Sequence, residues 1–146
     1  MVTDQELRHH VYTATVELGR PPLSGHLAVA LGVSPSDVLA GFRRLRERRL
    51  LYLAPDTGEV VMAPPFAAAP TPFLVMVNAR SYFANCVWDA YGIAAALHSD
   101  ASIEASCGCC GLPMPLAVEN GQPVATPGIA HFAVPAAHWR DDLPYT

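Results

Sequence analysis

The chain has 146 residues, of which 51% are hydrophobic and 15% are charged, and its net charge is −4. This composition excludes a disordered tail and predicts a packed globule of one ordinary domain or two small ones. No uncharged apolar run approaches the roughly 18–20 residues that cross a bilayer, and the polar N-terminus MVTDQELRHH is no signal peptide. We therefore expect a soluble cytoplasmic protein with no membrane partner and no overall attraction to nucleic acid.

Hydrophobic spacing in the first third of the chain predicts three helices. Thr3 can cap a helix that runs to about residue 18 and ends at Gly19. Residues 24–31 are expected to form a second, short helix. Ser34 caps a third helix, with Pro35 at its first position. The predicted buried stripe of this helix consists of Val38, Leu39, Phe42 and Leu45.

A β-hairpin is predicted next, from the apolar segments LLYL (50–53) and EVVMA (59–63) with the turn sequence PDTG between them. Helix, helix-turn-helix and hairpin, in this order, indicate a winged-helix-like domain over residues 1–66. The segment APPFAAAPTP (63–72) is typical of an extended linker, because each proline moves its predecessor out of the helical region. We place the domain boundary there, so that a second domain covers residues 67–146.

The third predicted helix ends in FRRLRERR, with five arginines against one glutamate. Arg43, Arg44 and Arg46 are the candidate DNA contacts, because the second helix of a helix-turn-helix can lie in the major groove. The alternative is a solvated helix face that suits the negative end of the helix dipole. The predicted hairpin carries Asp56 and Glu59 rather than basic residues, which weakens the DNA interpretation.

The second half predicts a small mixed β-sheet with packed helices, so the expected fold class is α+β. FLVMV (73–77) indicates a strand, and residues 81–98 indicate one helix or two helices broken at Gly92. Further strands are expected in SIEASC, PLAV, QPVAT and IAHFAV. The Asn120-Gly121 pair is a turn signal that joins two of these strands.

Four cysteines, three of them within four residues, fit no small secreted disulfide framework. Clustered thiols in a reducing compartment suggest metal or redox chemistry. Cys107, Cys109 and Cys110 form either a soft-metal site for Cu(I), Hg(II) or zinc, or a packed turn with one structural thiol. Structural zinc usually takes four ligands from two separated pairs, a spacing that is absent here.

Cys86 and Asp89 lie at or near a predicted helix start with i, i+3 spacing, so the sulfur and the carboxyl can converge. A helix N-terminus lowers the pKa of a thiol. A carboxyl that is partly buried beside Trp88 and Tyr91 tends to keep its proton. The pair would supply a soft nucleophile and a proton carrier, or else a buried structural cysteine and a capping aspartate.

Two long segments, SYFANCVWDAYGIAAALHSDASIEASCGCCGLPMPL and GIAHFAVPAAHWRDDLPYT, resemble the alkylmercury lyase (organomercurial lyase) family, and the likeness covers nearly the whole chain. The most specific parts are Asn-Cys-x-x-Asp at residues 85–89, SCGCCG with its following proline, and HFAVPAAHWRDDLPYT. The resemblance implies a winged-helix-like domain before a catalytic domain that cleaves carbon–mercury bonds. It also implies that Cys86 is the first mercury ligand, that Asp89 is the proton carrier and that Cys107 is structural.

The resemblance implies a small organomercurial substrate, a hydrocarbon and Hg(II) as products, no organic cofactor and a thiol acceptor for Hg(II). The family pattern continues past Thr146 with a second catalytic cysteine, a position outside this sequence. The sequence is then incomplete, or a thiol of the 107–110 group substitutes, or the fold persists without the reaction. The other two hypotheses are a DNA-binding regulator whose thiols sense a soft metal, and a non-catalytic thiolate protein that holds copper or mercury.

Overall fold

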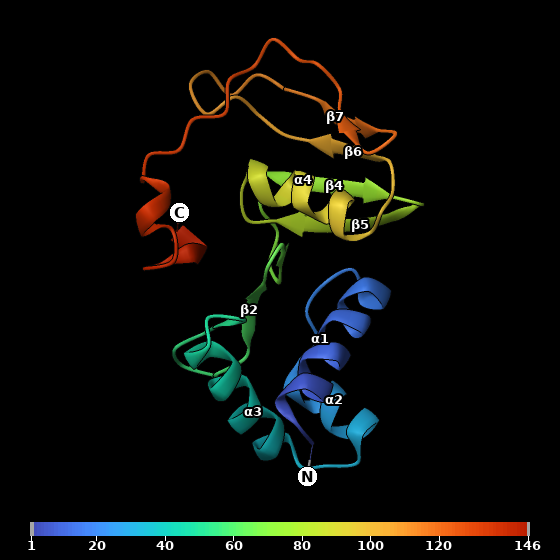
Figure 1. Cartoon of the computed structure of the whole chain (residues 1–146), viewed down its shortest axis with the longest axis vertical. Helices are drawn as coiled ribbons and strands as arrows, with labels where there is room; N and C mark the ends of the chain where they lie inside the picture. Colours follow the sequence, from blue (N-terminus) through green and yellow to red (C-terminus); the bar gives the residue numbers. More distant parts are fainter. Residues whose placement is uncertain (1, 146) are drawn as a thin grey trace.

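Three helices open the chain at the positions that the sequence predicts (Figure 1). The computed structural model describes residues 2–145. Both predicted N-caps are confirmed, since Thr3 and Ser34 each form a capping box. Gly19 ends the first helix in the left-handed conformation, with φ 79°. The helices are α1 (Asp4–Leu18), α2 (Ser24–Leu31) and α3 (Pro35–Glu47).

One continuous sheet of eight strands follows, in the order β1-β2-β3-β5-β4-β6-β7-β8. Every ladder is antiparallel, so the expectation of a mixed sheet was wrong. Short turns join most neighbouring strands, and such connections permit only antiparallel pairing. The strands are β1 (Tyr52–Leu53), β2 (Val60–Ala63), β3 (Phe66–Ala67), β4 (Phe73–Val77), β5 (Arg80–Ala84), β6 (Ala101–Glu104), β7 (Leu116–Glu119) and β8 (Gln122–Pro123).

The predicted linker over residues 63–72 contains a strand. Phe66 and Ala67 are buried and pair with β2 on one side and with β5 on the other. The strand was not predicted because it has only two residues and lies in a proline-rich segment. As a result the predicted hairpin, now β1 and β2, is hydrogen-bonded into the same sheet as the second half of the chain.

The helix predicted over residues 81–98 was wrong at its beginning. Residues 81–84 belong to β5, where Tyr82 and Ala84 are buried and their neighbours are less so, a period of two. A tight turn at Asn78 and Ala79, both with positive φ, joins β5 to β4. The helix α4 (Val87–Ala96) starts only after this strand and runs through Gly92 without a break.

The predicted strand in IAHFAV, residues 129–134, was also wrong, because this segment has no strand. Ile129 is 93% exposed, so the segment has no buried face to pack on a sheet. It leads into two short turns of 3-10 helix, Ala136–His138 and Leu143–Tyr145. The Asn120-Gly121 turn was predicted correctly: both residues have positive φ, and the turn joins β7 to β8.

Buried apolar side chains form two clusters, and the fold class is α+β. The first cluster lies among α1, α2, α3 and the β1–β2 hairpin, and the second lies between α4 and the sheet. Tyr12 of α1 packs against both clusters. Figure 1 shows the three helices at one end of the molecule and the main part of the sheet, with α4 on it, at the other.

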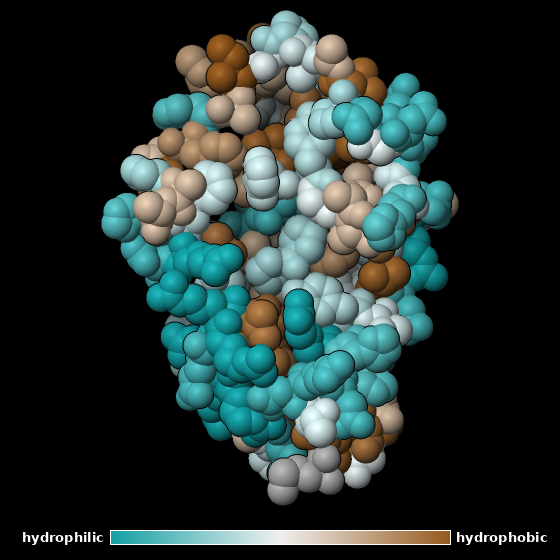
Figure 2. Space-filling model, in the orientation of Figure 1, coloured by the Kyte–Doolittle hydropathy of each residue, from teal (hydrophilic) through white to brown (hydrophobic). Residues whose placement is uncertain are grey.

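The surface differs between these two ends. Figure 2 shows mainly hydrophilic side chains over the end formed by the three helices, and more hydrophobic ones over the end formed by the sheet and the C-terminal segment. Among residues 2–145 no helix is long and apolar enough to cross a membrane.

Candidate active site

Cys86 and Asp89 converge at the start of α4. Cys86 is the N-cap residue, in an extended conformation, and Asp89 lies in the first helical turn. The Cys86 Sγ donates a hydrogen bond to Asp89 Oδ2 over 3.4 Å. The predicted convergence of a thiol and a carboxyl is therefore present. It arises because a chain that leaves a strand at Ala84 and enters a helix at Val87 puts residues i and i+3 on one side.

The C-terminal segment covers this pair. A small cavity of about 30 Å³ is lined by Asn85, Cys86, Trp88, Asp89, Phe132, Trp139 and Leu143. That volume has room for roughly one or two water molecules. Asn85 Nδ2 donates to the backbone oxygen of Leu143 over 3.0 Å, which fastens residues near the end of the chain to the start of α4. Figure 1 shows the red C-terminal turns beside this end of the helix.

Aromatic rings form most of the cover. The ring centroids of Phe132 and Trp139 lie 4.8 Å apart, and those of Trp88 and Trp139 lie 6.3 Å apart. Trp139 Nε1 donates to the backbone oxygen of Val134 over 2.7 Å, which orients the indole. The thiol and the carboxyl are half-buried and face a mainly apolar cavity, where charge is costly.

Burial sets the protonation of both groups. It raises the pKa of the Asp89 carboxyl, against the opposing effect of the Cys86 hydrogen bonds, as the sequence predicted. Burial also raises the pKa of the Cys86 thiol, and the neighbouring Asp89 charge adds to this effect. The expectation of a lowered thiol pKa was wrong, because desolvation outweighs the N–H groups of the first helical turn.

The other three cysteines lie in the connection between β6 and β7. A bridge between Ser106 and Pro113 closes this loop, and the Gly111 N–H donates to the Cys107 carbonyl oxygen over 2.8 Å. Gly111 has φ 71°, a conformation that glycine adopts without strain. Cys107 is half-buried, whereas Cys109 and Cys110 are exposed. The predicted sharp turn is thus present, and it keeps the three thiols within one loop.

Hydrogen bonds within this loop converge on Cys107. The backbone N–H groups of Cys110 and Cys109, and then the Cys110 thiol, lower the pKa of the Cys107 thiol. Across residues 2–145, no three His, Cys, Asp or Glu side chains are grouped closely enough to hold a metal ion. The loop thiols therefore do not join Cys86 and Asp89 in one cluster of ligands.

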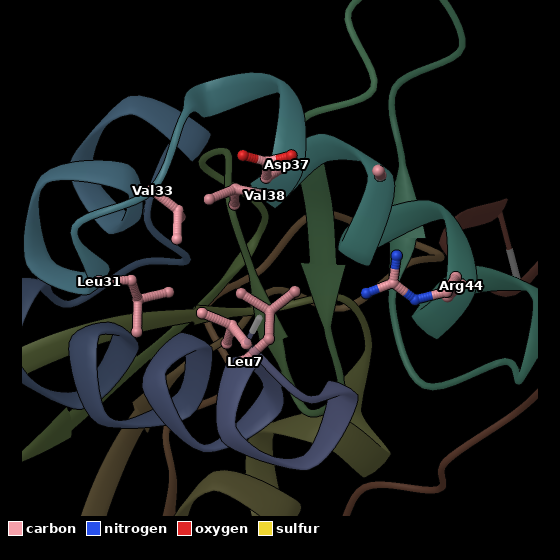
Figure 3. A pocket seen from close by; sticks show the side chains of 8 residues that line it. Leu7, Leu31, Val33, Asp37, Val38 and Arg44 are labelled. Atoms are coloured by element: carbon pink, nitrogen blue, oxygen red, sulfur yellow. The ribbon is translucent and has the colours of Figure 1, made fainter.

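The candidate DNA-binding arginines lie on α3. All three are exposed, and Arg44 Nε forms an ion pair with Asp4 Oδ1 of α1 over 2.8 Å. Arg44 also borders an apolar hollow of about 360 Å³ between α1 and α3. Figure 3 shows Arg44 reaching into this hollow from α3 and Leu7 reaching into it from α1. One of the three arginines is thus engaged within the chain itself.

Sequence reasoning did not assign Phe132, Trp139 and Leu143 to the site. All three lie in the segment HFAVPAAHWRDDLPYT, which was singled out for its resemblance but not for a role. Their separation from Cys86 by more than forty positions in the sequence leaves no local spacing to detect. The only available signal was two apolar aromatic residues in a segment with no regular hydrophobic period.

Comparisons with known proteins agree with these observations. A family model described as MerB, alkylmercury lyase, matches residues 66–143. A solved structure, described as the crystal structure of the mercury-bound form of MerB2, has a similar fold, with a TM-score of 0.63 and 22% sequence identity. The similarity covers 84% of this chain and 60% of that one, so this chain spans under two thirds of the length of that structure. No curated protein matches the sequence.

Proposed function

The chain belongs to the alkylmercury lyase family, and from this premise we propose that it cleaves the carbon–mercury bond of small organomercurials by protonating the carbon. The observation that carries the proposal is the 3.4 Å contact between Cys86 Sγ and Asp89 Oδ2 beneath the aromatic cover. A soft sulfur ligand and an acid side by side are the two groups that this reaction requires.

In the proposed first step, the Cys86 sulfur binds mercury. Mercury is a soft metal and prefers thiolate sulfur, so the thiol gives up its proton as the sulfur–mercury bond forms and the previous mercury ligand leaves with a proton. Asp89 Oδ2 already accepts the hydrogen bond from this thiol. An ionised Asp89 carboxylate can take this proton in place of the leaving ligand, which then departs as an anion, and the carboxyl is thereby protonated for the next step.

In the second step, the protonated Asp89 carboxyl delivers its proton to the carbon. The carbon–mercury bond breaks, the hydrocarbon leaves with both bonding electrons and the proton, and Hg(II) remains on the Cys86 thiolate and the Asp89 carboxylate. The raised pKa of Asp89 supports this role, because a carboxyl must hold its proton near neutral pH to act as an acid. No organic cofactor enters the scheme.

Substrate entry requires movement of the cover. The cavity of about 30 Å³ is smaller than an organomercurial together with its mercury atom. We infer that the segment carrying Phe132 and Trp139 shifts when substrate binds and then excludes water from the reacting carbon.

The N-terminal part of the chain is proposed to be a winged-helix-like domain, residues 1–66, that supports a catalytic domain, residues 67–146. The turn at Gly32 between α2 and α3 and the β1–β2 hairpin support this interpretation. We do not assign a nucleic-acid partner to it, because no specific contact favours one and Arg44 is paired with Asp4. A gel shift with salt titration tests that alternative.

Methane release from methylmercury tests the proposed reaction. Excess small-molecule thiol is included to supply further sulfur ligands for mercury and to accept Hg(II). The expected result is methane in the headspace with the wild-type chain, and none with Cys86→Ser or Asp89→Asn. Asp56→Asn, in the exposed turn between β1 and β2, is the matched control and should leave the rate unchanged.

The outcomes separate the remaining hypotheses. Methane at the same rate from the wild type and from Cys86→Ser would exclude the proposed mechanism. Mercury retained on Cys86 without any methane would instead support the non-catalytic thiolate protein, which holds copper or mercury and has no lyase activity.

A further inference from the structure

A second, larger hollow lies against the same first turn of α4. It has a volume of about 590 Å³, and its lining includes Val87 and Tyr91 of α4 together with Cys107 and Cys109 of the loop between β6 and β7. Cys86 and Asp89, on the neighbouring face of that helical turn, line the small cavity instead. The two spaces are therefore separated by one turn of helix.

The C-terminal segment also separates the two hollows. His131 lines the larger one, and the next residue, Phe132, lines the small cavity over Cys86. A movement of this segment, which substrate entry already requires, would therefore affect the boundary between both spaces. An Hg(II) ion released at Cys86 is therefore close to the loop that carries Cys107, Cys109 and Cys110.

The loop geometry pairs two of its three thiols. Cys107 and Cys110 stand at positions i and i+3 of one tight turn, which brings the two ends of the turn close together, whereas Cys109 lies at its tip. The five-residue turn is closed by the hydrogen bond from the Gly111 N–H to the Cys107 carbonyl, so this pairing is held by the backbone. Cys107 and Cys110 thus offer two sulfur atoms to one ion, with an exposed side open to exchange.

We propose that Cys107 and Cys110 form a two-thiol acceptor site that takes Hg(II) from Cys86. The source of the ion rests on the proposed function, but the binding site does not. Each loop thiol gives up a proton as its sulfur–mercury bond forms. The Cys86 sulfur and the Asp89 carboxylate each take up one proton as they release the ion, so the exchange is balanced and needs no oxidant or reductant.

The donor set selects Hg(II) over zinc. Hg(II) binds two thiolates in a linear arrangement, whereas zinc in proteins takes four ligands. Within the described part of the chain no third His, Cys, Asp or Glu side chain completes such a site. A two-coordinate soft ion is therefore the occupant that these residues can satisfy.

Mercury retention by the full-length Cys86→Ser variant tests this site without any contribution from the lyase reaction. The variant is loaded with mercuric chloride, challenged with excess glutathione and analysed by native mass spectrometry. One retained Hg(II) per chain is expected. The further change Cys110→Ser should weaken retention about 100-fold, because the second thiol binds intramolecularly and such avidity is worth roughly 10²–10⁴.

Cys109→Ser in the same Cys86→Ser background is the matched control and should retain the ion. Circular dichroism checks that each variant folds, and Cys110 is chosen over Cys107 because it is exposed. Equal retention after the Cys110 and Cys109 changes, or zinc held as firmly as mercury, would overturn the proposal. Failure of the proposed lyase reaction is a distinguishable result: the wild-type chain then releases no methane, although the loop still retains Hg(II).

Discussion

At the scale of single residues, Asp89 shows how burial prepares an acid. Its carboxyl lines a small, mainly apolar cavity with Trp139 and accepts a hydrogen bond from the half-buried Cys86 thiol. Loss of hydration disfavours the ionised form more than the hydrogen bonds from the Cys86 side chain and backbone stabilise it, so the pKa of Asp89 is raised. The same burial raises the pKa of Cys86, so the protein favours the protonated form of both groups relative to water.

Asp89 should make the stability of the protein fall as pH rises. Its folded-state pKa lies above the ordinary value of 3.8, so between these two values the folded state binds more protons than the unfolded state. Stability is then lost on raising the pH through that window, and the loss is complete above the folded pKa. Asp89→Asn removes this effect. The difference in Tm between Asp89→Asn and the wild type should therefore shift in favour of the variant as pH rises from about 4 to about 7.

Thermal unfolding at a series of pH values measures this difference. Asp56→Asn, an exposed aspartate in the hairpin turn, should track the wild type at every pH. A gap between Asp89→Asn and the wild type that stays constant or shrinks with rising pH would show that the carboxyl is not disfavoured by burial.

At the scale of secondary-structure elements, Glu59 connects the hairpin to α2. Its carboxylate accepts from the Ser24 backbone N–H over 2.8 Å and from the Ser24 hydroxyl over 2.6 Å. The N-cap residue of α2, Leu23, has no side chain that can accept such bonds. Glu59, thirty-five residues away in the sequence, therefore caps the N-terminus of α2 from outside the helix.

Glu59→Ala should lower the free energy of unfolding by about 2 kcal/mol, since hydrogen bonds to charged groups contribute about 1.5–3 kcal/mol and Ser24 is buried. Urea unfolding followed by circular dichroism measures the change. Glu47→Ala, an exposed residue at the end of α3, is the control and should stay within about 0.5 kcal/mol of the wild type. Equal effects of the two substitutions would exclude the capping role.

At the scale of the whole molecule, the end of α1 joins the two buried clusters. The Val16 carbonyl oxygen accepts from the Tyr82 hydroxyl over 3.0 Å and from Arg80 Nη1 over 3.1 Å. Arg80 also donates to the carbonyl of Glu17. These carbonyls lie in the last turn of α1, where the helix itself provides no partners, so side chains of β5 satisfy them. Tyr12 completes the connection, with its hydroxyl donating to the Pro64 carbonyl over 2.8 Å.

The double variant Arg80→Ala/Tyr82→Phe should uncouple the two clusters. The wild type is expected to unfold in one thermal transition, and the double variant in two, because the end of α1 loses its partners from β5. Differential scanning calorimetry distinguishes these results. A single transition at an unchanged Tm would mean that the apolar contacts of Tyr12 and the continuous sheet are enough to couple the clusters.

The local features of this protein could be predicted from the spacing of side chains along the chain. The caps Thr3 and Ser34, the Asn120-Gly121 turn and the i, i+3 contact of Cys86 with Asp89 depend on side chains within four positions of one another. Such features carry a spacing signal that survives in any tertiary context. The resemblance to the alkylmercury lyase family also rested on short ordered motifs, and the family match over residues 66–143 confirms it.

Features that depend on long-range contacts and on burial could not be predicted in this way. Residues 81–84 look helical in isolation, yet pairing with β4 makes them a strand, and pairing with β2 and β5 makes Phe66 part of the sheet rather than of a linker. The predicted direction of the Cys86 pKa shift was wrong, because the thiol is desolvated in a cavity whose lining includes Phe132 and Trp139, residues distant in the sequence. Desolvation depends on everything that surrounds a group, and no spacing along the chain records it.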